Sequence, residues 1–232
     1  MLRVPNPVIL CTVPSRIAAL HVPEPGFVIR NRFLPEQAEA LGCVDPGSTE
    51  PGMKLYLSRS KGENFGGAAN EPELEEALAR EGWTIAHPQE HGVEEQLRLL
   101  ARAEDILAIE GSALHSMILL RNVRGRVTII PRPFPVNANY ATIAAGKGIR
   151  QRHLEQDGLY SDVRGEEPRT TGKLEVRTVL GRLADLRARN AAPMERVGQL
   201  PSYRAWVEAH IPDPVWTASP DRSREYAGHF RR

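Results

Sequence analysis

From residue 53 onward, short apolar segments alternate with amphipathic ones, and this alternation constrains the fold more than any other feature of the chain. The apolar segments have the length of strands and carry apolar residues on both faces. Strands of this kind are typical of a parallel sheet that helices cover on both sides. The order β-α-β-α-β-α-β therefore predicts a doubly wound, Rossmann-like α/β domain. The expected strands are Met53–Ser58, Trp83–Ala86, Asp105–Ile109 and Arg126–Ile130, and the expected helices are Asn70–Glu81, Val93–Ala103 (with Val93, Leu97, Leu100 and Ala101 facing inward) and Ser112–Arg121.

The regions on either side have weaker patterns. We expect a short N-terminal region with its linker over 1–50, the α/β domain over 51–155, and a helical extension with a mobile tail over 156–232. The elements expected before the domain are strands at Val8–Thr12 and Phe27–Arg30, a helix at Pro35–Leu41 and a linker at Asp45–Gly52. Those expected after residue 131 are a helical turn at Tyr140–Ala145, a strand at Ile149–Leu154, a loop over Leu159–Lys173, and helices at Leu174–Ala188 and Ser202–His210.

Composition excludes several classes of function. The 30 basic and 29 acidic residues leave a formal net charge of +1, so the chain lacks the positive surface that binds nucleic acid. No apolar run is long enough for a transmembrane helix, and the two cysteines, Cys11 and Cys43, do not make a disulfide framework. His87 and His91 flank Pro88-Gln89-Glu90, but this spacing fits no standard metal motif. We expect a cytoplasmic protein without a metal site, a nucleic-acid partner or a transmembrane segment.

The junction after the strand Asp105–Ile109 is the strongest candidate for a ligand site. A helix that begins directly at a strand end presents unpaired backbone N–H groups and a positive dipole end, where phosphates bind. Gly111 lets a ligand approach the backbone, Ser112 can cap the helix, and Ala113 adds a further N–H donor. An ordinary helix start with no ligand is the alternative.

Three other side chains near strand ends are candidates. Arg59 follows the first strand, where its guanidinium could grip a diphosphate or simply be solvated. Glu110 could accept hydrogen bonds from sugar hydroxyls, act as a base, or pair with Arg59. His115 lies one helical turn after Gly111, so it either reaches the edge of the ligand or packs.

Asn70 and Glu71 begin the first helix of the α/β domain. As a cap and a first-turn acid, they complement the helix dipole. Alternatively, Glu71 turns toward the cleft and contacts an arginine or the ligand.

Four short blocks of the α/β region stand in order along the chain: Lys54–Arg59, Asn70–Leu74, Glu95-Gln96 and Gly111–Leu114. Together they resemble the C-terminal nucleotide-sugar-binding domain of family 61 glycosyltransferases, over about residues 50 to 135. The resemblance implies a GT-B architecture and an inverting transfer from a nucleotide sugar, most often a UDP-sugar, to a glycan or other hydroxyl acceptor. It implies no tightly bound cofactor. Because bacterial members act on capsular and other surface polysaccharides, it also implies polysaccharide-assembly partners and a peripheral position at the inner membrane face.

The chain departs from the family pattern in three ways. Gly66–Ala69 stands where family members commonly carry arginines before the Asn-Glu pair, and Glu110 stands where many have a histidine. The roughly fifty residues before the domain are too few for a full N-terminal GT-B domain. Glu110 and Glu71 are the candidate catalytic carboxylates, unless the half that is poorly represented here supplies the base. These departures leave open a non-catalytic nucleotide-sugar-binding or assembly module that lacks the acceptor domain.

Overall fold

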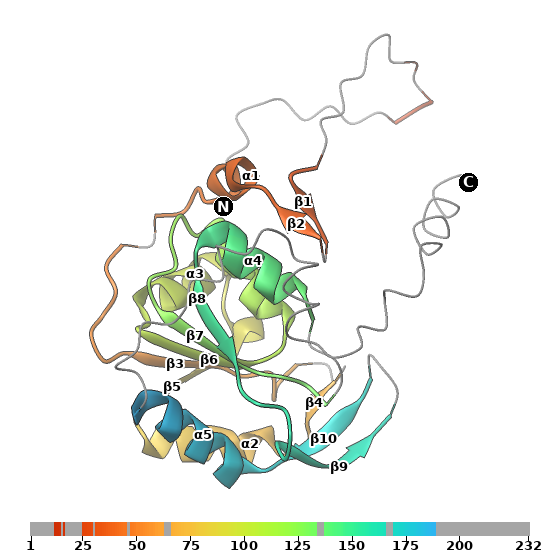
Figure 1. Ribbon diagram of the computed structural model, residues 1–232. Coiled ribbons are helices and arrows are strands. Elements are labelled where there is room, and N and C mark those ends of the chain that lie inside the picture. The colour runs from red at the N-terminus through yellow and green to blue at the C-terminus, as the bar shows by residue number, and fades with distance from the viewer. Residues whose placement is uncertain are drawn as a thin grey trace.

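A five-stranded parallel sheet, in the order β5-β3-β6-β7-β8, forms the centre of the computed structural model (Figure 1). The structure describes residues 12–14, 16, 25–29, 31–45, 47–62, 66–133, 137–165 and 169–188. All neighbouring strands of this sheet pair in parallel, so the predicted doubly wound, Rossmann-like sheet is confirmed. The strands are β3 (Lys54–Leu57), β5 (Thr84–Ala86), β6 (Asp105–Ile109), β7 (Arg126–Ile130) and β8 (Arg150–His153).

Helices cover both faces of the sheet, as the doubly apolar strands predicted. Alternate residues of each strand serve the two faces: Leu55 and Leu57 pack in one cluster and Tyr56 in the other. The first cluster is closed by α3 (Val93–Arg102), the 3₁₀ helix η2 (Ser112–Leu119) and α4 (Asn139–Lys147). The second is closed by α2 (Glu71–Arg80) and α5 (Val176–Ala188). In α3, Val93 is exposed and Leu99 is buried, so the inward face was predicted wrongly at its first residue.

A second, three-stranded sheet corrects the loop expected over Leu159–Lys173. Its strands, in the order β4-β10-β9, are β4 (Gly67–Ala68), β10 (Thr171–Leu174) and β9 (Tyr160–Arg164). Most of β9 is exposed, and its polar residues therefore lack the apolar alternation by which strands are recognised. Figure 1 shows this sheet beside α2 and α5.

The order of the strands determines where a ligand-binding crevice can form. The chain passes from β3 outward to β5 and then crosses back to β6, from which it continues toward β7 and β8. The connections after β3 and β6 therefore leave the sheet in opposite directions. Ligands of open α/β sheets bind at the carboxyl ends of two such strands.

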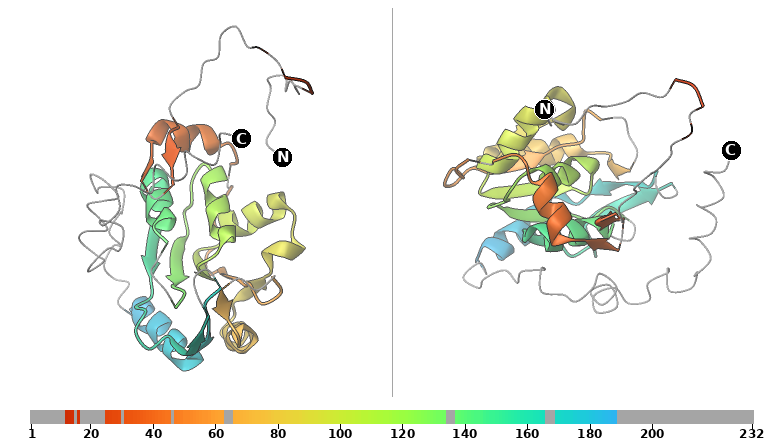
Figure 2. Two further views of the ribbon diagram at one scale, coloured as in Figure 1. Left: turned by 90° about the vertical axis from the view of Figure 1, so that its right-hand side faces the viewer. Right: turned by 90° about the horizontal axis from the view of Figure 1, so that it is seen from above.

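The N-terminal elements β1 (Phe27–Val28), β2 (Arg32–Phe33) and α1 (Pro35–Leu41) pack on α4, as the views of Figure 2 show. The helix α1 has the predicted bounds. Of the strand expected at Val8–Thr12, the structure describes only Thr12, and the helix expected at Ser202–His210 lies outside the described residues. Within the described residues, no helix is long and apolar enough to cross a membrane.

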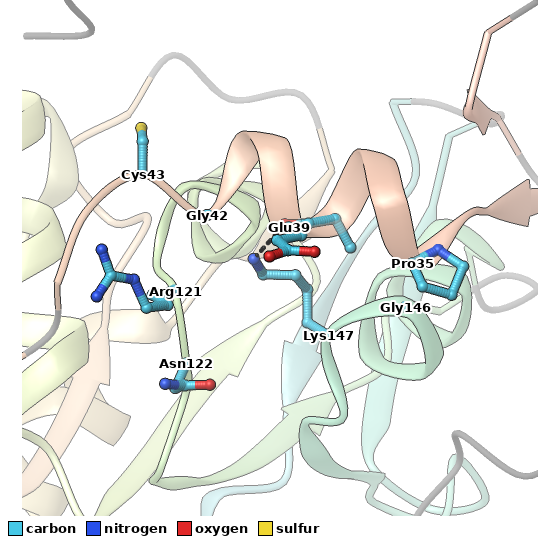
Figure 3. A pocket seen from close by; sticks show the side chains of 9 residues that line it. Pro35, Glu39, Gly42, Cys43, Arg121, Asn122, Gly146 and Lys147 are labelled. Atoms are coloured by element: carbon cyan, nitrogen blue, oxygen red, sulfur yellow. Dashed lines mark hydrogen bonds between the residues drawn. The ribbon is translucent and has the colours of Figure 1, made fainter.

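A pocket of about 590 Å³ lies between α1 and the end of α4 (Figure 3). Lys147 extends from the last turn of α4 and donates a hydrogen bond from Nζ to the Ala38 carbonyl, at 2.8 Å. Burial lowers the pKa of Lys147. The ammonium thereby joins α4 to the C-terminal carbonyls of α1, where a cation is favoured.

Gly42→Ala is expected to lower the free energy of unfolding by about 2 kcal/mol, because a Cβ on Gly42 would stand 2.7 Å from Lys147 Nζ. Its φ of −73° suits alanine, so the loss comes from displacing Lys147 and from crowding against the Ala38 carbonyl oxygen and Arg121 Cα, each 3.1 Å from the added Cβ. Urea unfolding of the variant measures the change. Gly181→Ala in α5, where a Cβ would meet open space, is the control and should stabilise the protein slightly. An unchanged midpoint for Gly42→Ala would show that the Lys147 contact contributes nothing.

Candidate functional site

A cleft of about 750 Å³ opens at the carboxyl ends of β3 and β6, where the strand order places a ligand. The residues after β3 and the start of η2 form its floor, and one wall is the run Gly66–Ala69. The turn η1 (Pro88–Glu90) contributes to its rim. Five of the candidate side chains or backbone positions line it: Arg59, Glu71, Gly111, Ser112 and Ala113.

Arg59 lies across the turn at Gly111. A Cβ on Gly111 would stand 3.1 Å from Arg59 Cδ and 3.3 Å from its Nη1, so the guanidinium rests directly on the glycine backbone. Its Nη1 donates a hydrogen bond to the Glu110 carbonyl. The charge of Arg59 is therefore fixed beside the first residues of η2, at the edge of the cleft.

The helix that begins at this turn is a 3₁₀ helix, which corrects the α-helix expected at Ser112–Arg121. Its buried residues Leu114 and Met117 are three apart, which is the period of a 3₁₀ helix. The N-cap is Gly111 rather than Ser112, and it has an extended φ of −167°.

Two backbone N–H groups at the start of η2 are available to bind an anion. Ser112 and Ala113 are the first residues of the helix, so they have no acceptor within it, and none lies among the described residues. Leu114 N instead bonds to the Gly111 carbonyl at 3.2 Å. The N–H groups of Ser112 and Ala113 are therefore available for a ligand, and the Arg59 guanidinium lies next to them.

Glu71 lines the cleft from the start of α2, although only 2% of its surface is exposed. Its Oε1 accepts hydrogen bonds from the Tyr56 hydroxyl and the Arg59 N–H, both at 2.8 Å, and lies 3.3 Å from Ser58 Oγ. Burial raises the pKa of Glu71, and the hydrogen bonds from Arg59, Tyr56 and Ser58 partly offset this effect. The carboxylate therefore holds the backbone that carries Arg59.

Glu110 turns away from the cleft. It is 1% exposed, and its Oε1 and Oε2 accept hydrogen bonds from the backbone N–H groups of Asn137, at 3.0 Å, and Arg132, at 3.4 Å. Burial raises its pKa. Arg59 contacts its carbonyl rather than its carboxylate. The geometry favours a structural role for this side chain.

Asn70 and His115 also lie outside the cleft lining. Asn70 occupies the N-cap position of α2, but its amide bridges to Leu174 of β10, with Nδ2 at 3.1 Å from the carbonyl and Oδ1 at 2.7 Å from the N–H. The His115 ring packs on Tyr140, with centroids 5.0 Å apart, and burial lowers its pKa. Both residues brace elements around the site.

Sequence reasoning missed several lining residues. Gly66–Ala69 forms a wall of small side chains, for which the Gly-Gly-Ala-Ala run was the available signal. Thr171 reaches the cleft from β10, in the region expected to be a loop. Gln96 also lines the cleft, and its Nε2 donates to the Pro88 and His91 carbonyls at 2.7 and 2.9 Å, so it braces the turn η1.

One model of a known protein family matches part of the chain. Residues 15–127 match the family model described as Glycosyltransferase 61. The matched range contains α1, β3, α2, β6 and η2, and thus most of the cleft. No curated protein matches the sequence.

Proposed function

We propose that this chain, which belongs to glycosyltransferase family 61 through residues 15–127, binds the diphosphate of a nucleotide-sugar donor in the cleft between β3 and β6. The Arg59 guanidinium and the N–H groups of Ser112 and Ala113 would contact the phosphate oxygens. The observation that carries the proposal is the guanidinium resting on Gly111, beside two backbone N–H donors that have no acceptor in the part of the chain that the structure describes.

The chemistry of glycosyl transfer favours this assignment. When the anomeric carbon leaves its donor, negative charge develops on the departing phosphate oxygen, and a fixed cation with aligned N–H donors stabilises that charge. The cleft, at about 750 Å³, has the size of a small-molecule site rather than of a single phosphate. A UDP-sugar is the donor class that we propose to test first, with inverting transfer to a hydroxyl acceptor. In a GT-B arrangement the acceptor would approach the open side of the cleft from a second domain.

A thermal-shift panel of UDP, GDP, CDP and CMP, with UDP-glucose and UDP-N-acetylglucosamine, tests the proposal. A ligand at a hundred times its dissociation constant adds about 2.7 kcal/mol to the stability of the folded state, so a specific binder gives a clear shift. In Gly111→Val the new side chain must displace Arg59, because even a Cβ would be 3.1 Å from Cδ. The extended φ of Gly111 accommodates valine without backbone strain. The shift should disappear in this variant.

Gly92→Val is the matched control, because a Cβ at Gly92 would meet nothing within 4 Å. It should keep the nucleotide-induced shift. No shift with any compound, or a shift that persists in Gly111→Val, would contradict the assignment of the donor site. A bound donor from which the protein never releases nucleotide would favour the binding-module alternative.

A further inference from the structure

We propose that Glu71 is the general base that removes the proton from the attacking hydroxyl, an inference that rests on the proposed function of the cleft. Both buried carboxylates at the carboxyl edge of the sheet, Glu71 and Glu110, were candidates. The contacts of their oxygens distinguish them.

One carboxylate oxygen of Glu71 accepts no hydrogen bond from the described residues. All the hydrogen bonds that Glu71 receives from the described residues end on Oε1, and Oε2 has no partner among those residues. Because Glu71 lines the cleft, this oxygen can take a proton from a ligand there. Glu110 has both oxygens engaged by backbone N–H groups and does not line the cleft.

Glu71 is also tied to the proposed phosphate site. Its Oε1 binds the backbone N–H of Arg59 at 2.8 Å, while the side chain of the same arginine rests on Gly111. A single residue therefore links the proton acceptor to the group that holds the leaving phosphate. This link fixes the distance between them, which displacement at one carbon requires.

The step is a single displacement at the anomeric carbon. The O–H bond of the acceptor breaks and its proton moves to Glu71 Oε2, while the acceptor oxygen bonds to the anomeric carbon. The bond from that carbon to the diphosphate breaks, and its electron pair leaves on the diphosphate oxygen. Arg59 and the N–H groups of Ser112 and Ala113 then hold the added negative charge. Glu71 afterwards releases the proton to water.

The surroundings of Glu71 suit a base. The titratable groups that face it are Tyr56 from β3, Glu75 from its own helix, Tyr160 from β9 and Arg59 from the loop after β3. His87 lies behind Glu75, with Nε2 4.0 Å from Glu75 Oε2. Burial and the charge of Glu75 raise the pKa of Glu71. A raised pKa makes a carboxylate a stronger base.

The Glu71→Gln variant distinguishes a catalytic role of Glu71 from a structural one. The amide oxygen can still accept from Tyr56 and Arg59, but the amide nitrogen cannot accept a proton. With the UDP-sugar that gives the largest thermal shift as probe, we expect its dissociation constant to stay within about threefold. The rate of UDP release at saturation should fall by about 100- to 10,000-fold. Glu76→Gln on the same helix, exposed and paired with Arg80 at 3.2 Å, is the matched control and should retain the wild-type rate.

The Tyr56→Phe variant adds a measurement, the pH profile of kcat/KM, that would not change if Glu71 had only a structural role. The Tyr56 hydrogen bond lowers the pKa of Glu71, so its removal should shift the acidic limb of the pH profile of kcat/KM to higher pH. In Glu71→Gln that limb should be absent.

Three outcomes overturn the assignment. One is a rate within threefold of wild type in Glu71→Gln, and another is an acidic limb that does not move in Tyr56→Phe. The third is a wild-type protein that binds the UDP-sugar without releasing UDP. This result would contradict the assignment of Glu71 as the base but not the assignment of the donor site. Failure of the wild type to bind any nucleotide is separate, because it contradicts the proposed function itself.

Discussion

Arg59→Ala is expected to weaken the binding of a nucleoside diphosphate by roughly 100-fold. Hydrogen bonds to charged groups contribute about 1.5–3 kcal/mol each, and 1.4 kcal/mol corresponds to a factor of ten in affinity. The guanidinium is held at Gly111 before any ligand arrives, so little conformational entropy is lost when it binds. Isothermal titration with the nucleotide found in the thermal-shift panel measures the change.

Two further arginine variants test whether the loss of affinity depends on the guanidinium group of Arg59. Arg59→Lys keeps the charge but loses the planar fork, so it should recover only part of the lost affinity. Arg98→Ala, on the exposed face of α3 where Arg98 pairs with Glu94 and Glu95, should bind as tightly as wild type. Equal dissociation constants for wild type and Arg59→Ala would contradict the proposed contact between Arg59 and the diphosphate.

The central sheet was predictable because its strands are buried on both faces. Their apolar runs stand out, and β6 and β7 have the predicted bounds. The strands β9 and β10 were missed for the opposite reason: β9 is polar and mostly exposed, so hydrophobic periodicity carries no signal there. Sequence patterns therefore detected the sheet that supports the cleft but not the sheet that borders it.

The site was predictable in position but not in the direction of its side chains. Strand ends located Arg59 and the turn at Gly111, which both line the cleft. The same reasoning placed Glu110 in the site, although its carboxylate accepts hydrogen bonds from the backbone N–H groups of Arg132 and Asn137 and does not line the cleft. Strand parity does not give this direction, because Ala108, which has the same parity as Glu110 along β6, lines the cleft.

The 3₁₀ form of η2 could not be predicted from the sequence, because its apolar residues Leu114, Met117 and Ile118 also fit the i, i+3, i+4 spacing of an α-helix. The distinction matters for ligand binding, because Leu114 N already bonds to the Gly111 carbonyl and only the first two N–H groups stay available. The proposed phosphate site therefore has fewer free N–H donors than an α-helical N-terminus, and the Arg59 guanidinium would supply additional donors.

Glu110→Ala is expected to lower the free energy of unfolding by about 3 kcal/mol. The change leaves the N–H groups of Arg132 and Asn137 without their acceptor, and each unsatisfied buried donor costs about 1–3 kcal/mol. Glu110→Gln should lose about half as much, since its amide keeps one acceptor oxygen but turns an NH₂ group toward the second donor. Urea unfolding at pH 7 measures both variants.

The comparison of stability with turnover decides between the two roles of Glu110. If its carboxylate only accepts hydrogen bonds from the backbone of Arg132 and Asn137, the folded fraction of Glu110→Gln should release nucleotide within a few-fold of the wild-type rate. If it acts in the chemistry, stability should change little and the rate at saturating donor should fall by at least about 100-fold. We expect the first result, because both carboxylate oxygens are already engaged by backbone donors.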